Sequence, residues 1–260
     1  MALVYLPDMR LNADLRGDVS APPVVLIHAL GTNGGLWADV PLTPNLRVLS
    51  MDLRGHGASD APPPPYQMGA MIRDVERLMD HFNLRDAVVV GISLGGLIAQ
   101  GLAIKRLDLV RGMVLSNTAA KIGTAELWNA RCDEISRTGL QPYADGAMER
   151  MLGRAWRDHP KMPMLRQMLV QTALDGWIGA ARAIAGTDFF TPTAALRLPT
   201  LAIAGANDGT TPPDLVRETA DLIPGAEFHL MRGVGHLPML DNPVAYGALI
   251  AAFLARIGHG

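Results

Sequence analysis

The sequence predicts an α/β protein, built on a mostly parallel sheet of eight strands with helices on both faces and an inserted helical cap. Apolar runs such as 24–28 and 88–92 lack the alternation of a half-buried strand, which is typical of strands covered on both faces. Between them, residues 68–82 carry apolar side chains at the 3.6-residue period of an amphipathic helix. This alternation of strands and helices favours a parallel sheet between helical layers.

The composition is that of a globular protein with a substantial core. Of the 260 residues, 49% are hydrophobic and 18% are charged. The net charge of -2 gives no electrostatic case for binding nucleic acid or an anionic membrane. The single cysteine, Cys132, excludes an intrachain disulfide, and no apolar run reaches the length of a transmembrane helix. No signal-peptide pattern is present at the start, so we expect a cytoplasmic protein; its oligomeric state is not predicted.

The expected strands and helices follow in a regular order. Two short strands are expected within residues 2–14, followed by buried strands at 24–28, 47–51, 88–92, 113–116, 200–205 and 227–231. The last two strands are each followed by a helix, at about 212–223 and 243–257. Pro212 and Pro243 suit the first turns of these helices.

Residues 120–195 differ from the rest of the chain. They hold three of the four tryptophans and many methionines, and no pattern among them predicts a strand. We therefore predict a helical cap at 120–195, inserted after the sixth strand. Residues 1–119 and 196–260 would form the core.

A nucleophilic serine is predicted at Ser93. The motif Gly91-Ile92-Ser93-Leu94-Gly95 lies between a β-branched run and a helical pattern. On such a turn, strained backbone angles hold the serine hydroxyl at a helix N-terminus, where developing negative charge is stabilised. The glycines let strand and helix approach closely. The motif alone also fits an ordinary glycine-rich turn. Whether Ser93 is a nucleophile therefore depends on whether the chain also supplies a base and an acid.

A serine nucleophile needs a general base, and the base needs an acid that orients it. His236 follows the last predicted strand and is the candidate base, while Asp208 follows the strand at 200–205 and is the candidate acid. Asp208 could instead stabilise a turn or cap the next helix. Asp214 resembles a first-turn helix residue.

The loop after the strand at 113–116 offers Asn117 and Thr118 but no carboxylate. Attack by a serine places negative charge on the substrate's carbonyl oxygen. We expect the backbone N–H groups of Leu94 and Leu30 to donate to this oxyanion, with Ala29 as the alternative to Leu30.

No cofactor or metal is expected, because the chain has no metal-ligand spacing and no glycine-rich phosphate loop. His28 would either tune the loop that holds Leu30 or pack in the core. His56 is expected to brace a turn.

These motifs resemble the α/β-hydrolase superfamily nearly end to end, and Ser93, Asp208 and His236 follow its order of nucleophile, acid and base. Its landmarks are residues 52–59, the Ser93 turn and Gly235-His236. Residues 115–124 with Trp128 and Arg131, together with residues 204–213, resemble the 3-oxoadipate enol-lactonases of aromatic-compound breakdown. The chain departs from that family at His28-Ala29-Leu30, where Asn-Ser or His-Gly is expected before the leucine.

The resemblance implies hydrolysis of a small carboxylated lactone by water, through an acyl-enzyme and without a cofactor. A planar guanidinium suits the carboxylate, and Arg131 is the candidate. Arg131 lies one helical turn from Trp128, so both could face the same pocket. Arg131 could equally be a solvated charge of the cap, and Lys121 is the second choice.

Two other functions remain open. The triad is common to carboxylesterases and carbon–carbon bond hydrolases, since the cap selects the substrate. A non-catalytic ligand-binding protein on this fold would have no need of Ser93, Asp208 and His236 together.

Overall fold

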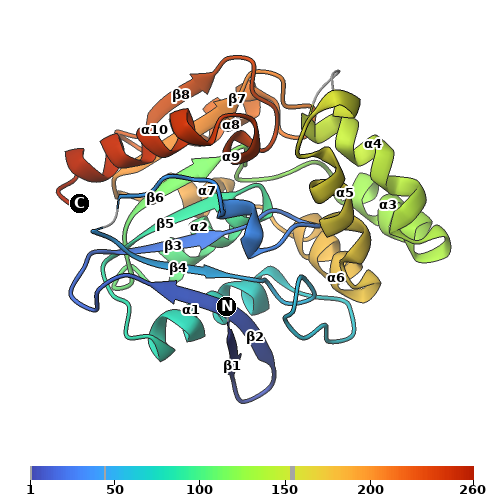
Figure 1. Cartoon of the computed structure of the whole chain (residues 1–260), viewed down its shortest axis with the longest axis horizontal. Coiled ribbons are helices and arrows are strands. Elements are labelled where there is room, and N and C mark those ends of the chain that lie inside the picture. Colours follow the sequence, from blue (N-terminus) through green and yellow to red (C-terminus); the bar gives the residue numbers. More distant parts are fainter. Residues whose placement is uncertain (1, 44, 153–155) are drawn as a thin grey trace.

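A twisted eight-stranded sheet runs through the centre of the molecule (Figure 1), within residues 2–43, 45–152 and 156–260, which the computed structural model describes. The strands are β1 (Ala2–Tyr5), β2 (Arg10–Arg16), β3 (Pro23–Ile27), β4 (Arg47–Met51), β5 (Ala87–Ile92), β6 (Val110–Ser116), β7 (Thr200–Gly205) and β8 (Glu227–Met231). Their order is β1-β2-β4-β3-β5-β6-β7-β8. β2 pairs antiparallel with both β1 and β4, and the six strands from β3 to β8 form the parallel part. The predicted mostly parallel sheet is confirmed.

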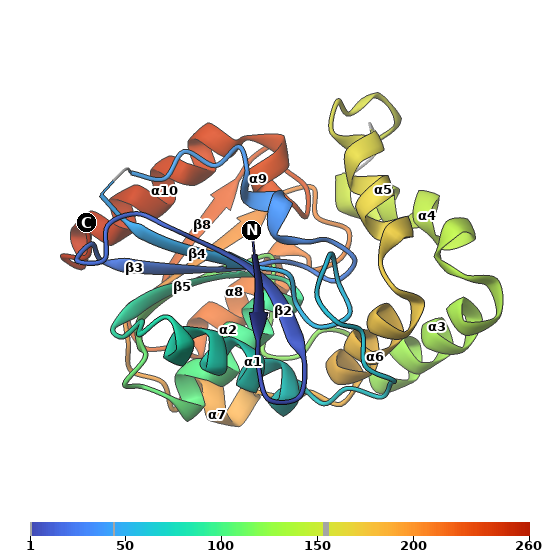
Figure 2. The same ribbon diagram turned by 60° about the horizontal axis from the view of Figure 1, so that its bottom comes forward.

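Helices cover both faces of this sheet, as predicted (Figure 2). One face carries α1 (Met68–His81), α2 (Leu94–Lys105) and α7 (Phe190–Ala194), and the other carries η1 (Gly34–Trp37), α9 (Pro238–Asp241) and α10 (Pro243–Arg256). The remaining core helix, α8 (Pro213–Asp221), packs on β7. All six residues of β5 are buried, which explains why its apolar run does not alternate.

Helices fill the described part of residues 120–195, with no strand among them. They are α3 (Ala125–Thr138), α4 (Leu140–Leu152), η2 (Trp156–Asp158), α5 (Met162–Gln171), α6 (Leu174–Ala185) and α7. α3 to α6, here called the cap helices, lie beside the sheet (Figures 1 and 2). α7 instead packs on α2, where Thr193 Oγ1 donates to Gln100 Oε1 at 2.8 Å. The division into a core and a cap domain stays a prediction.

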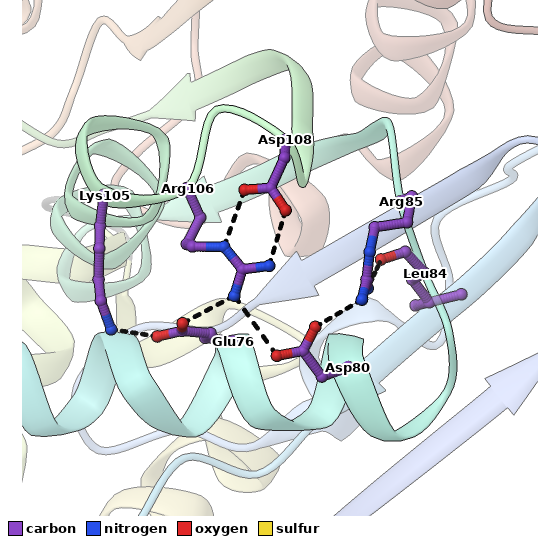
Figure 3. Close-up of polar contacts among 7 residues, drawn as sticks. All are labelled: Glu76, Asp80, Leu84, Arg85, Lys105, Arg106 and Asp108. Atoms are coloured by element: carbon purple, nitrogen blue, oxygen red, sulfur yellow. Dashed lines mark hydrogen bonds and ion pairs between the residues drawn. The ribbon is translucent and has the colours of Figure 1, made fainter.

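A network of ion pairs joins the outer sides of α1 and α2 (Figure 3). Arg106 Nη1 lies 2.8 Å from Glu76 Oε1, and Lys105 contacts the same carboxylate. Arg106 also binds Asp108 at 2.7 Å, and Asp80 lies between Arg106 and Arg85. Most of these groups are at least partly exposed, so each pair contributes little to stability.

α2 lies unusually close to the strands beside it. A Cβ added at Gly95 would strike the carbonyl oxygen of Ile27 in β3, and one added at Gly91 would strike the carbonyl of Gly95. Glycine is therefore required at both positions by contact with backbone, which has no flexible end that could move aside. This close approach sets where α2 begins and hence where Ser93 lies.

Two buried histidines hold the loops after β3 and β4 together. His28 Nδ1 donates to the carbonyl of Ala29 at 2.8 Å, and its Nε2 accepts from the N–H of Leu53 at 2.9 Å. His56 Nδ1 donates to the carbonyl of Arg54 at 3.0 Å, as expected of a residue that braces a turn. Burial lowers the pKa of His28 to about 4 and that of His56, which also faces His28, to about 3. Both rings are therefore neutral at pH 7.

We expect Gly95→Ala to lower the free energy of unfolding by about 2–3 kcal/mol, because the new methyl group overlaps the backbone of β3. The matched control is Gly69→Ala in α1, where an added Cβ meets nothing within 4 Å. Urea unfolding of both variants measures the difference. Equal stabilities for the two variants would show that the close approach of α2 to β3 does not exclude a side chain at position 95.

Stability should fall as the pH is lowered from about 6.5 toward 4, because the unfolded chain protonates its histidines near pH 6.5 while His28 and His56 stay neutral in the folded protein. Between pH 7 and pH 5, each buried histidine should lower the free energy of unfolding by about 2 kcal/mol. The His56→Asn variant keeps a donor for the carbonyl of Arg54. Over this pH interval, its free energy of unfolding should fall by about 2 kcal/mol less than that of the parent.

Urea unfolding at the two pH values tests this expectation, with the exposed His81→Asn as the control. Carboxylates titrate in all three proteins, so their contribution cancels in the comparison. A His56→Asn variant with the same pH dependence as the parent would contradict a neutral, buried His56.

Candidate active site

Ser93 occupies the turn between β5 and α2 with a strained backbone. Its φ is 55° and its ψ is -117°, a conformation that side-chain-bearing residues rarely adopt. Two hydrogen bonds to the neighbouring β6 edge hold it there. The N–H of Ser93 donates to Ser116 O at 3.0 Å, and Thr118 Oγ1 donates to Ser93 O at 2.7 Å. Such strain at a strand-to-helix turn is what the glycine–serine motif predicts.

His236 and Asp208 form a buried hydrogen-bonded pair. His236 Nδ1 lies 2.8 Å from Asp208 Oδ2, and both side chains are almost completely buried. A proton on Nδ1 leaves Nε2 with the lone pair that a general base requires. The order in which the sequence places these residues had suggested this pairing.

The carboxylate of Asp208 is also held by the loop that follows it. Its Oδ1 accepts from the N–H groups of Thr210 and Thr211, at 2.6 and 3.1 Å. Thr211 Oγ1 donates to Oδ2 at 2.7 Å. Asp208 therefore stabilises its own turn, the alternative interpretation, and orients His236 as well. Asp214 lies in the first turn of α8, exposed to solvent, as its position in the sequence indicates.

Ser93 and His236 line one pocket between the sheet edge and the cap helices. Leu30, Trp128 and Arg131 line it too, so five of the predicted site residues meet there. The pocket is narrow, with a cavity volume of about 30 Å³. Its walls are otherwise mostly apolar and aromatic, which suits a small substrate held by a few polar groups.

The predicted cationic residues differ in their surroundings. Arg131 Cζ lies 4.8 Å from the ring centre of Trp128, so the indole face holds the guanidinium. The indole Nε1 donates to Ile122 O at 2.6 Å and is therefore already used. Lys121 pairs with Asp188 at 3.0 Å near the surface and does not line the pocket.

The two predicted oxyanion donors are free to bind a ligand. Within the described part of the chain, no acceptor binds the N–H of Leu30 or of Leu94. The loop that carries Leu30 is fixed through Ala29, whose carbonyl accepts from His28 Nδ1 and from Thr32 Oγ1 at 2.9 Å. His28 thus tunes this loop and is also part of the buried core.

Asn117 connects the loops of the site, a role that the sequence did not suggest. Its Nδ2 donates to Gly235 O at 3.0 Å and to His236 O at 2.7 Å, and its Oδ1 accepts from Gly205 N at 2.7 Å. Its backbone φ is 40°. The signal in the sequence is its place at the carboxyl end of β6, directly after a buried strand.

The C-terminal end of α4 holds the same loops from the other side. Arg150 O accepts from Gly209 N at 3.1 Å, and Met151 O accepts from His236 N at 2.7 Å. Asp241 adds a third contact, because its Oδ2 accepts from Gly235 N at 2.5 Å. Burial raises the pKa of Asp241. The backbone that carries His236 is therefore anchored to the cap as well as to the core.

No group of three or more histidine, cysteine or acidic side chains is arranged to hold a metal ion in the part of the chain that the structure describes. In the same residues, none of the helices combines the length and the apolar character needed to cross a membrane.

Several known proteins are similar to this chain over nearly its whole length. 3-Oxoadipate enol-lactonase 2 of Acinetobacter baylyi is 30% identical over 253 residues, which cover 96% of this chain and 94% of the relative. The crystal structure of the enol-lactonase from Burkholderia xenovorans LB400 superposes with a TM-score of 0.93 at 30% identity, covering 98% of this chain and all of the other. A pimeloyl-[acyl-carrier protein] methyl ester esterase of Chromobacterium violaceum is 30% identical over 244 residues, 90% of this chain and 94% of the esterase.

The family model described as the alpha/beta hydrolase fold matches residues 22–243, which include the sheet from β3 to β8, Ser93, Asp208 and His236. These similarities agree with the observed sheet order and with the turn at Ser93. The relatives indicate a hydrolase. The chain belongs to the α/β-hydrolase family.

Proposed function

We propose that the protein is a serine hydrolase that opens 3-oxoadipate enol-lactone to 3-oxoadipate, through an acyl-enzyme, in the breakdown of aromatic compounds. The observation that carries the proposal is the shared pocket, which brings together Ser93, the His236–Asp208 pair and the guanidinium of Arg131. The similarity to two enol-lactonases at about 30% identity supports the choice of substrate.

In the first step, Ser93 Oγ attacks the lactone carbonyl while His236 Nε2 accepts its proton. Asp208 keeps the proton on Nδ1 and stabilises the imidazolium that forms. The N–H groups of Leu30 and Leu94 bind the oxyanion, and such a donor typically contributes about 3 kcal/mol in the transition state.

The ring oxygen then leaves as an enol, with a proton from His236. The enol becomes a ketone, so the ring does not close again. His236 next takes a proton from water, whose oxygen attacks the acyl carbon. The bond from this carbon to Ser93 Oγ breaks, Oγ takes the proton back from His236, and 3-oxoadipate leaves. No cofactor takes part in this sequence.

The carboxylate of the lactone would bind Arg131, which Trp128 supports from one side. A second candidate is hydrolysis of another small carboxylic ester, which the Chromobacterium violaceum esterase favours. Both reactions use the same serine chemistry and differ in the acyl group that the cap admits.

Purified protein should consume the enol-lactone rapidly, measured as loss of its ultraviolet absorbance, and a fluorophosphonate should label Ser93 stoichiometrically by mass spectrometry. Ser93→Ala should abolish both. Labelling of Ser93 with turnover of simple aryl esters, but none of the lactone, would contradict the substrate. Absence of any adduct at Ser93 would contradict the serine mechanism.

Asn117→Ala should lower kcat/KM about 10- to 100-fold, because the two hydrogen bonds to the His236 loop and the one from Gly205, which together tie this loop to β7, are lost. The pH profile of kcat should shift as well, since the hydrogen-bond geometry of His236 changes.

The matched control is Asn242→Ala, which removes the N-cap of α10 and should destabilise the protein by about 1 kcal/mol without affecting the site. If Asn117→Ala loses stability yet keeps the parental kcat/KM and pH profile, Asn117 has no part in positioning His236.

A further inference from the structure

Arg150 is a charged side chain in the pocket that makes no ion pair with any residue that the structure describes. It lies in the last turn of α4 and lines the same pocket as Ser93 and His236. Its Nη2 is buried and makes no hydrogen bond. A buried charged donor without an acceptor is costly, so the free protein holds it at the expense of stability. An anion in the pocket would remove this cost.

A second guanidinium, that of Arg131, contacts the same aromatic ring as Arg150 and lines the same pocket. Arg150 Cζ lies 5.1 Å from the ring centre of Tyr143, and Arg131 Cζ lies 5.8 Å from it. Arg131 also contacts Trp128. Aromatic faces orient planar guanidinium groups without consuming their N–H donors. Both cations are thus held in place with donors still available.

Nothing acidic neutralises this pair. In the described residues, no carboxylate lies within ion-pair distance of Arg131 or Arg150, and the pocket lining contains neither aspartate nor glutamate. Elsewhere on the cap helices, arginines form ion pairs with carboxylates, as Arg166 does with Asp145 at 3.0 Å. The pocket lining therefore carries two positive charges and, among the described residues, no negative one.

We propose that Arg150 determines substrate specificity together with Arg131, and that the two guanidiniums form one subsite for the carboxylate of an anionic acyl group. The inference rests on the proposed function in that Ser93 must be acylated, but it does not require a lactone ring. It extends the site to a residue of α4 that the sequence did not single out.

The chemistry of a carboxylate fits such a subsite. Its two oxygens accept several hydrogen bonds, and each guanidinium presents its N–H groups as a planar fork. A neutral substrate of the same shape would leave both cations unpaired in the pocket. Rejection of the neutral substrate then comes from the cost of these unpaired groups, which discriminates more strongly than a missing apolar contact.

The place of Arg150 on α4 gives the subsite a second effect. The carbonyls of Arg150 and Met151 accept from Gly209 and from His236. An anion bound by the Arg150 side chain therefore also restrains the end of the helix that positions the His236 backbone. Loss of the side chain should reduce kcat as well as raise KM for anionic substrates.

The test compares mono-4-nitrophenyl adipate with 4-nitrophenyl hexanoate, which have acyl chains of equal length and differ in the terminal carboxylate. We expect the parent to favour the adipate. Arg150→Met keeps an unbranched stem but removes the guanidinium, and it should lower kcat/KM for the adipate about 10- to 100-fold, while kcat/KM for the hexanoate changes less than about threefold. Arg150→Lys keeps the charge but not the fork and should recover part of the loss.

Arg137→Met, on the exposed side of α3, is the matched control and should leave both substrates unaffected. If the two guanidiniums share one carboxylate, Arg131→Met and Arg150→Met together should cost less than the product of their separate effects. Equal losses on both substrates, or no loss on the adipate, would overturn the proposal.

A binding measurement separates this inference from the proposed reaction. Calorimetric titration of the Ser93→Ala protein with adipate should show binding that Arg150→Met weakens about tenfold or more. Binding of adipate that is unchanged by Arg150→Met would refute the subsite. Preference for the adipate ester without turnover of the enol-lactone would leave the subsite standing and reject only the lactone as substrate.

Discussion

The strained backbone of Ser93 is the constraint on which the rest of the site depends. A residue with φ of 55° persists only where its surroundings hold it, and here Ser116 at the end of β6 binds its N–H, while Thr118 in the loop after β6 binds its carbonyl. α2 must then begin within contact distance of β3, which is why Gly91 and Gly95 have no side chains. The turn, the start of α2 and the loop of Leu30 therefore form one rigid unit.

Much of this arrangement could be predicted because it follows from repeated patterns. Buried strands such as β5 have apolar runs, and the carboxyl ends of parallel strands meet at one edge, so Ser93, Asp208 and His236 were expected near each other. The contributions of Asn117, Arg150 and Met151 were not foreseen. Backbone carbonyls carry no sequence signal, and the contacts of a side-chain amide depend on which loops tertiary packing brings beside it.

The polar groups of the site fall into two electrostatic classes. Beneath the loops, His28 and His56 are buried, neutral and hydrogen-bonded to backbone, so they set geometry without adding charge. Above Ser93, the cap helices contribute two guanidiniums that aromatic rings hold in place. In the function that we propose, the core would supply a reaction centre common to many hydrolases, and the cap helices would supply the charge that distinguishes one acyl group from another.

The two carbonyls at the end of α4 have a consequence for how such enzymes diverge. They hold the loops of Asp208 and His236 through main-chain atoms alone, so the two hydrogen bonds themselves do not depend on which side chains stand at positions 150 and 151. The cap sequence is free to change its pocket-facing residues while this attachment persists. New substrates can then be acquired by substitution in one helix. A cap transplanted from a relative should function only when it keeps the hydrogen bonds that the carbonyls at positions 150 and 151 accept from Gly209 and His236.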